Sequence, residues 1–205
     1  TGNAAIGVSW QIFLVVIVFV VSVFTGMGIL VARFAGAGEP DKVNRVVFQG
    51  FLTAMFMILF VLAPVGLFFA SDLLGLLNAA PDVRAEALPY LRTLFLFSFG
   101  MLLYYMIAGV LRAACDARTP LRLGVAMTVL NLIASIILIR GLGPIPAFGT
   151  LGAAMGTVIA SGIVAAYGFY LLLTNKLVVR FPENISWRPD WSIIRELFRF
   201  GLPTG

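Results

Sequence analysis

Charged residues are absent from long stretches of this chain and gather in the short segments between them. The five uncharged runs are residues 1–32, 46–71, 93–111, 123–139 and 141–175. A helix needs about 20 consecutive apolar residues to cross the hydrocarbon layer of a membrane, and a single segment can satisfy its own backbone groups there only as a helix. The pattern therefore predicts an all-α, polytopic transmembrane bundle in which no span carries a charge. The predicted spans are about 6–32, 46–70, 88–111, 121–139 and 150–174.

The segment after the last run has a different pattern. In "RPDWSIIRELFRFG", Trp191, Ile194, Leu197 and Phe198 fall on one side of a helix and the charged side chains fall mostly elsewhere. A helix of this kind lies in the membrane interface rather than across the membrane. We expect residues 176–205 to be a connection that carries an interfacial helix, and its final "FRFGLPTG" is typical of the start of a sixth span.

Composition agrees with this assignment. The 205 residues are 61% hydrophobic and 11% charged, with a mean hydropathy of +1.05, whereas soluble domains contain about 25% charged residues. One cysteine and no histidine exclude a disulfide framework, a zinc cluster of Cys and His, and a His-based catalytic triad. With no acid, histidine or cysteine expected inside a span, no enzyme and no cofactor are predicted. The net charge of +5 favours a basic membrane face over nucleic acid as the partner.

The fourteen Lys and Arg residues are divided unevenly between the connections. The first, third and fifth connections hold eleven of them, and the second and fourth hold three. Positive residues stay on the cytoplasmic side of a membrane, so segments 33–45, 112–122 and 176–199 are expected to be cytoplasmic in a multi-pass protein of the plasma (inner) membrane. The first run then passes from outside to inside, which predicts one further helix before it.

Candidate binding residues are neutral and polar, because no span is expected to carry a charge. Asn131 and Ser135 are four residues apart, hence on one face of a helix, and Thr157 and Ser161 repeat this spacing in the next span. These faces either line a cavity that binds a substrate or ion, or bond to neighbouring helices, as small polar residues commonly do in membranes. The other two candidates for lining such a cavity are Tyr105, which could instead be ordinary packing, and Gln49.

Two local motifs concern packing and turns. Gly152 and Gly156 form a GxxxG pair, which in an apolar helix indicates close helix packing. In "LRAACDARTPLR" (111–122), Thr119 is expected to cap the following helix, with Pro120 at its first position.

Three segments carry a family pattern. "GILVARFAGAGEPDKVNRVVFQGFL" (28–52) has a Gly-x-Gly-acidic turn between two spans, and "ALPYLRTLF" (87–95) opens another span. "GVLRAACDARTPLRLGVAMTVLNLIASIILIRGLGPIPAFGTLGAAMGTVIA" (109–160) joins an Arg/Asp/Pro hairpin, an Asn-centred helix, a Gly/Pro loop and a Gly-Ala-Ala helix. These segments resemble the second to sixth helices of the MATE (multidrug and toxic compound extrusion) family of secondary transporters, in which Gly is common at the position of Cys115.

The resemblance implies the N-terminal lobe, without its first helix, of a twelve-helix antiporter. The implied partners are the lipid bilayer, small organic cations, the missing first helix and the C-terminal lobe, and the implied coupling ion is H⁺ or Na⁺. Members that couple through this lobe often have an Asp four residues after the Asn, and Ser135 stands there instead. A serine hydroxyl does not gain or lose a proton near neutral pH. The acidic residue that binds the coupling ion is therefore expected elsewhere in the protein. The alternatives are a flippase for lipid-linked sugars in the same superfamily, and a membrane scaffold.

Overall fold

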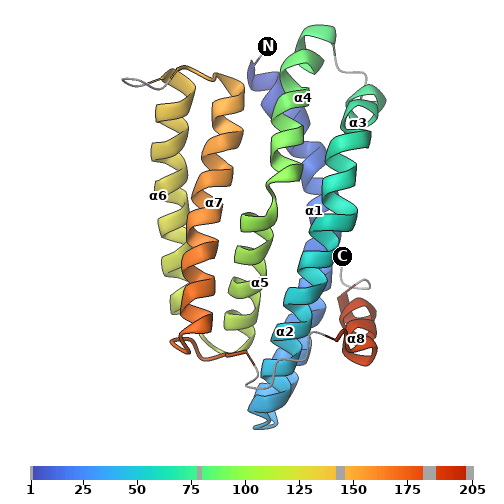
Figure 1. Ribbon diagram of the computed structural model, residues 1–205, viewed down its shortest axis with the longest axis vertical. Coiled ribbons are helices and arrows are strands. Elements are labelled where there is room, and N and C mark those ends of the chain that lie inside the picture. Colours follow the sequence, from blue (N-terminus) through green and yellow to red (C-terminus); the bar gives the residue numbers. More distant parts are fainter. Residues whose placement is uncertain (1, 78–79, 142–145, 182–187, 202–205) are drawn as a thin grey trace.

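A computed structural model describes residues 2–77, 80–141, 146–181 and 188–201, and every regular element within them is a helix (Figure 1). Four continuous helices are long and apolar enough to cross a membrane, and α4 with α5 makes a fifth, bent by 50°. The predicted all-α polytopic bundle is therefore confirmed. The elements are α1 (Gly2–Gly36), α2 (Pro40–Met57), the π-helical η1 (Ile58–Leu62) and η2 (Val65–Phe69), α3 (Ala70–Leu76), α4 (Pro81–Leu96), α5 (Phe99–Ala113), α6 (Arg118–Arg140), α7 (Thr150–Leu173) and α8 (Trp191–Gly201).

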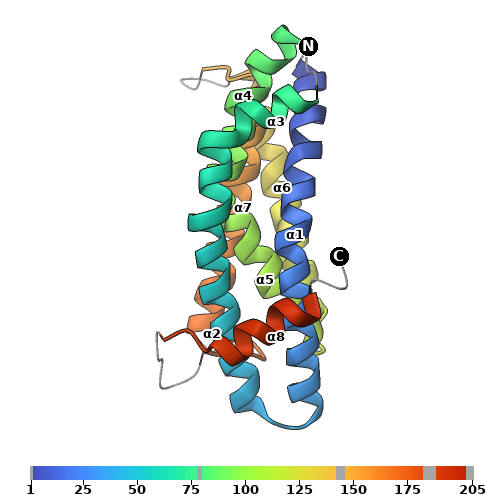
Figure 2. The same ribbon diagram turned by 90° about the vertical axis from the view of Figure 1, so that its right-hand side faces the viewer.

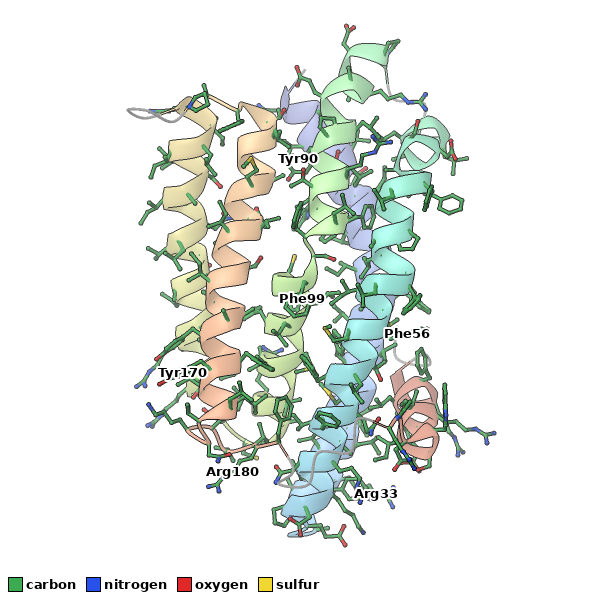
Figure 3. The ribbon with its side chains drawn as sticks, in the orientation of Figure 1. Arg33, Phe56, Tyr90, Phe99, Tyr170 and Arg180 are labelled. Atoms are coloured by element: carbon green, nitrogen blue, oxygen red, sulfur yellow. The ribbon has the colours of Figure 1, made fainter. Side chains whose placement is uncertain are left out.

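The connections alternate between the two ends of the bundle. α1, α5 and α7 end at the lower end in Figure 1, and α3 and α6 end at the upper end, near the N-terminus. Arg33 and Arg180 both lie at the lower end (Figure 3). We call it the basic end, because its three connections carry most of the Lys and Arg residues. The arrangement matches the up-and-down order predicted from the charges.

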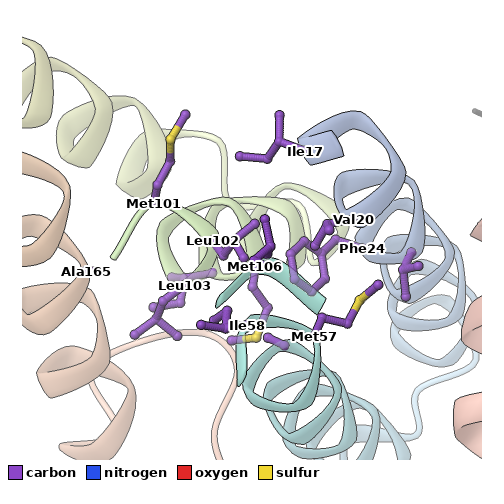
Figure 4. Close-up of a cluster of buried hydrophobic side chains, with 14 of the residues drawn as sticks. Ile17, Val20, Phe24, Met57, Ile58, Met101, Leu102, Leu103, Met106 and Ala165 are labelled. Carbon is purple, nitrogen blue, oxygen red and sulfur yellow. The ribbon is translucent and has the colours of Figure 1, made fainter. Parts of the chain in front are cut away.

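The centre of the bundle lies where α1, α2 and α5 meet. Val20 and Phe24 of α1, Met57 of α2, and Leu102 and Met106 of α5 are all buried there (Figure 4). Lipid tails are as apolar as these side chains, so close van der Waals packing, rather than the expulsion of water, is what favours such contacts in a membrane.

Pro64 interrupts the second span without ending it. η1 and η2 flank the proline, and the N–H of Ala63 donates to the carbonyl of Ile58, five residues back. Proline has no N–H to offer the helix, and a π-helical turn shifts the ladder by one residue while keeping it closed. η2 is held against α4 at Gly66, where an added Cβ would meet the side chain of Phe95.

The fourth span differs from its prediction. Its helix begins at Pro81 rather than near residue 88, and it breaks between α4 and α5. Arg92 lies on α4 and Arg122 on α6, both within predicted spans and both exposed, so the expectation of charge-free spans is wrong for these two helices. At the break, the Ser98 hydroxyl donates to the carbonyl of Phe95 over 2.9 Å, which satisfies one backbone group that the interruption frees.

α6 and α7 form a closely packed hairpin at one side of the bundle (Figure 1). A Cβ added to Gly152 of α7 would lie 2.6 Å from the Leu138 carbonyl oxygen of α6, and one added to Gly156 would lie 2.9 Å from the Ser135 nitrogen. The packing predicted from the GxxxG pair is confirmed. α6 is otherwise scarcely covered, since two of its 23 residues are buried.

α8 lies across α1 near the basic end (Figure 2). A Cβ added to Gly26 of α1 would lie 2.8 Å from the Gly201 nitrogen of α8, so glycine is required for this crossing. Leu197 of α8 is buried and Arg195 is exposed, as the amphipathic sequence predicts. Trp191, which was expected on the same side as Leu197, is instead 75% exposed.

In the turn between α5 and α6, the cap of α6 differs from the one predicted at Thr119. Asp116, not Thr119, caps α6: its Oδ1 accepts hydrogen bonds of 3.1 Å from the N–H groups of Arg118 and Thr119, and Pro120 is the third helical residue instead of the first. The hydrogen bond from the Thr119 side chain is the main cause that lowers the pKa of Asp116. The carboxylate therefore keeps its charge, and the cap persists until acid protonates it.

Cys115 ends α5 in the left-handed conformation, with φ of 65°. Its N–H donates to the Arg112 carbonyl over 3.1 Å, and the N–H of Asp116 donates to the Leu111 carbonyl over 2.8 Å. This is the pattern of a Schellman cap, whose left-handed position is usually glycine. A side chain there is strained because its Cβ crowds the following carbonyl oxygen.

Replacing Cys115 by Gly is expected to raise the free energy of unfolding by up to about 1 kcal/mol, because it relieves the left-handed strain. Cys115→Val, with its branched Cβ, is expected to lower it. Thermal unfolding of both variants of the full-length protein in detergent measures the effect. A Gly variant less stable than the parent contradicts the account.

Candidate functional site

Asn131 of α6 and Thr157 of α7 face each other across the α6–α7 hairpin. The Asn131 Nδ2 donates to the Thr157 Oγ1 over 2.9 Å, and the Thr157 hydroxyl donates to the Ala153 carbonyl over 3.1 Å. Both side chains are half-buried. Of the six candidate residues, these two are the pair that the structure joins by a hydrogen bond.

The contact between Gly156 and Ser135 brings α6 and α7 close enough for this hydrogen bond. Thr157 follows Gly156, which packs against the Ser135 side chain and backbone, and Ser135 lies one turn beyond Asn131 on the same face of α6. The two helices therefore approach closely enough for a short amide to reach a hydroxyl. Ser135 lies at the seam as well, but as a packing partner of the glycine.

The Asn131–Thr157 pair still has a hydrogen-bond acceptor that no described residue uses. An amide oxygen can accept two hydrogen bonds, and within the described residues the Asn131 Oδ1 receives none. α6 and α7 contain no carboxylate, so the seam offers neutral donors and acceptors only. In the described parts of the chain, no three His, Cys, Asp or Glu residues are grouped so that they could hold a metal ion.

Ser161 and Tyr105 lie away from the pair. Ser161 is buried, and its hydroxyl donates to the Val158 carbonyl of its own helix over 3.1 Å. It adjoins Gly162, whose backbone packs against Gly100 of α5. Tyr105 of α5 is half-buried with its ring centroid 5.7 Å from that of Tyr104. Both residues remain predictions as cavity-lining groups.

Gln49 has a different environment. It is buried on α2; its Nε2 donates to the Arg188 carbonyl over 3.1 Å, and its Oε1 accepts from the N–H of Asp190 over 3.1 Å. Both ends of the amide therefore bind the backbone that leads into α8. The Asp190 carboxylate in turn caps α8 through Ser192, whose hydroxyl donates over 2.6 Å and lowers the pKa of Asp190. The residues that surround Gln49 could not be assigned from the sequence, since they lie about 140 positions away.

A family model described as MatE matches residues 3–137. The chain belongs to the MatE family. This MatE chain is 28% identical over 202 residues to the probable multidrug resistance protein YoeA of Bacillus subtilis, and 31% identical over 214 residues to the probable multidrug resistance protein NorM of Agrobacterium fabrum. Each match covers 98% of this chain and 43% of the relative, so the chain spans less than half the length of these relatives.

Solved structures confirm the MatE fold. An inward-facing and an outward-facing structure of a multidrug resistance MATE family transporter of the MOP superfamily both match with TM-scores of 0.86 and 22% identity. The matches cover 98% of this chain and 45% and 44% of those chains. The chain thus has the fold of half a MATE transporter, as the resemblance implied.

Gly156→Val is expected to lower the free energy of unfolding by about 2 kcal/mol, because the added side chain would overlap Ser135 and force α6 and α7 apart. Gly109→Val is the matched control, since a Cβ on Gly109 meets nothing within 4 Å. Thermal unfolding of the full-length variants compares them. Equal stability of the two variants would show that the hairpin does not depend on this contact.

Gln49→Leu leaves two backbone groups of the connection without a partner and is expected to speed hydrogen exchange at the Asp190 amide by about tenfold. Thr53→Val is the control: Thr53 is also buried on α2, but its hydroxyl bonds the Gln49 carbonyl of its own helix. Exchange measured by mass spectrometry on peptides that contain Asp190 tests this. Unchanged exchange in the Leu variant would show that the Gln49 side chain does not hold the connection before α8 in place.

Proposed function

We propose that the protein exports organic cations across the plasma (inner) membrane in exchange for H⁺ or Na⁺, with this chain as one lobe. The observation that carries the proposal is the MatE match over residues 3–137. It is supported by several relatives that are named probable multidrug resistance proteins. Segments 33–45, 112–122 and 176–199 would face the cytoplasm, because they hold most of the positive residues.

Asn131 and Thr157 are the residues proposed to bind the substrate or ion. The free acceptor capacity of Asn131 suits an N–H donor of an organic cation or a sodium ion, which accepts neutral oxygen ligands. Ser135, Ser161, Tyr105 and Gln49 remain weaker candidates, because each is engaged in packing or in bonds within this lobe. The coupling acid is proposed to lie outside α6 and α7, which have no carboxylate.

Alternating access is proposed to proceed by rocking of two lobes about a central cavity. The fold of this chain matches an inward-facing and an outward-facing transporter equally well, with a TM-score of 0.86 in each case. A lobe that keeps its fold in both states supports a rigid-body movement. The flippase alternative is less favoured, since a phosphate substrate calls for cations in the cavity and the stretch of α6 from Leu123 to Ile139 and all of α7 have none.

The test is efflux of ethidium from vesicles that contain the full-length protein, under an imposed H⁺ or Na⁺ gradient. Asn131→Ala and Thr157→Ala are each expected to lower the initial rate by about tenfold, the effect of losing a hydrogen bond to a charged ligand. Thr128→Ala is the control, because Thr128 is exposed on α6 and bonds its own helix at the Gly124 carbonyl.

If neither gradient moves the dye, the antiport proposal fails. If the dye moves but both Ala variants match the Thr128 control, the antiport proposal stands and the site assignment fails.

A further inference from the structure

A large cavity opens at the basic end, away from the Asn131–Thr157 pair. It has a volume of about 1380 Å³ and lies between the first turns of α2, the end of α7 and the connection before α8. Among the described residues, four cations and two carboxylates line it, which gives this part of the lining a positive charge. Lys42 is already paired with Glu39 at 2.9 Å. Within the described residues, the side chains of Arg45, Arg180 and Arg188 make no hydrogen bond or ion pair, although Arg45 is near enough to Asp190 to help lower the pKa of that carboxyl.

Two successive turns of α2 hold these arginines in place. The Asn44 Oδ1 accepts from the backbone N–H of Arg180 over 3.0 Å, and the buried Gln49 binds the Arg188 carbonyl. Arg45 lies between them on the same helix. The backbone of the connection is thus fastened to α2 on both sides while the guanidinium groups are left for a ligand. Guanidinium groups bind phosphate through two parallel hydrogen bonds.

A second cavity, an apolar pocket of about 270 Å³, lies between α2, α5 and α7 and shares no lining residue with the first. We call the two cavities together the α2–α7 groove. Phe51 and Met55 of α2 and Gly162 and Phe169 of α7 line its sides, and Phe99 of α5 lines it at mid-height (Figure 3).

Four packed aromatic rings lie between the two cavities. Phe48 and Phe181 line the basic cavity and stand edge to face at 5.6 Å, while Phe51 and Phe169 line the apolar pocket and stack at 5.4 Å. Phe181 lies 5.8 Å from both Phe51 and Phe169. A ligand in this groove would meet charge at the membrane surface, then aromatic rings, then an apolar slot.

We propose that the α2–α7 groove binds one anionic phospholipid of the leaflet at the basic end, with its phosphate on Arg45, Arg180 and Arg188 and an acyl chain along the phenylalanines into the apolar pocket. Basic pockets between transmembrane helices bind anionic headgroups in this way. A free phosphate would use the arginines and leave the apolar pocket without a role, so the presence of both cavities between α2 and α7 favours the lipid. The inference does not depend on the transported substrate.

Native mass spectrometry of the full-length protein, titrated with dioleoylphosphatidylglycerol or dioleoylphosphatidylcholine, tests the headgroup. Arg45→Gln/Arg188→Gln is expected to weaken binding of the anionic lipid by about thirtyfold, at about fivefold for each basic residue, and to leave the zwitterionic lipid unchanged. Arg195→Gln/Arg199→Gln removes the same charge from α8, outside the cavity, and is the matched control. Equal weakening in both double variants would mean diffuse attraction and would overturn the site.

Gly162→Leu tests the acyl chain. A Cβ on Gly162 meets nothing within 4 Å, so the larger side chain fits the fold and fills the slot; Gly109→Leu is its control. Weaker binding of dioleoylphosphatidylglycerol in the Gly162 variant alone supports the proposal, and unchanged binding refutes it. Glycerol phosphate and inorganic phosphate are added as soluble competitors. If either displaces the lipid at equal concentration, the groove binds a free anion and the proposal fails.

Discussion

A helix that crosses lipid has to satisfy its own backbone hydrogen bonds, because no water is there to replace them, and the irregular parts of this lobe show how that constraint is met. At Pro64 the chain widens into π-helical turns that keep the ladder closed. At the break between α4 and α5 the Ser98 hydroxyl takes up the Phe95 carbonyl. The π-helical stretch packs against protein on one side, where Gly66 of η2 meets Phe95 of α4.

Close approach of backbones is the second theme of the lobe. Gly152 and Gly156 bring α7 onto α6, Gly100 brings α5 onto α7, and Gly26 with Gly201 lets α8 cross α1. Such a contact can place neutral polar groups within reach of a partner that a larger residue would have kept away. The Asn131–Thr157 hydrogen bond is the clearest example, and it connects the packing of the hairpin with its proposed role in binding.

The regular helices were predictable from the sequence, whereas their interruptions and partners were not. The uncharged runs predicted 121–139 and 150–174, close to α6 and α7 as observed, because length and apolarity alone decide whether a segment can cross a membrane. The break in the fourth span was missed: Pro89 lies inside α4, and the chain bends at residues 97–98 instead. The faces of Asn131 and Thr157 followed from spacing, but their pairing depends on how two helices are rotated against each other. The partners of Gln49 are set by tertiary packing alone.

The turn at Cys115 has a practical consequence. It is the single cysteine of the chain, its side chain is exposed, and it lies at the end that carries the three basic connections. A thiol reagent that does not cross membranes therefore has one sulfur atom to react with in this chain, on one side of the bilayer. The residue that strains the backbone turn is also the natural position for a spectroscopic label that follows how the lobe tilts.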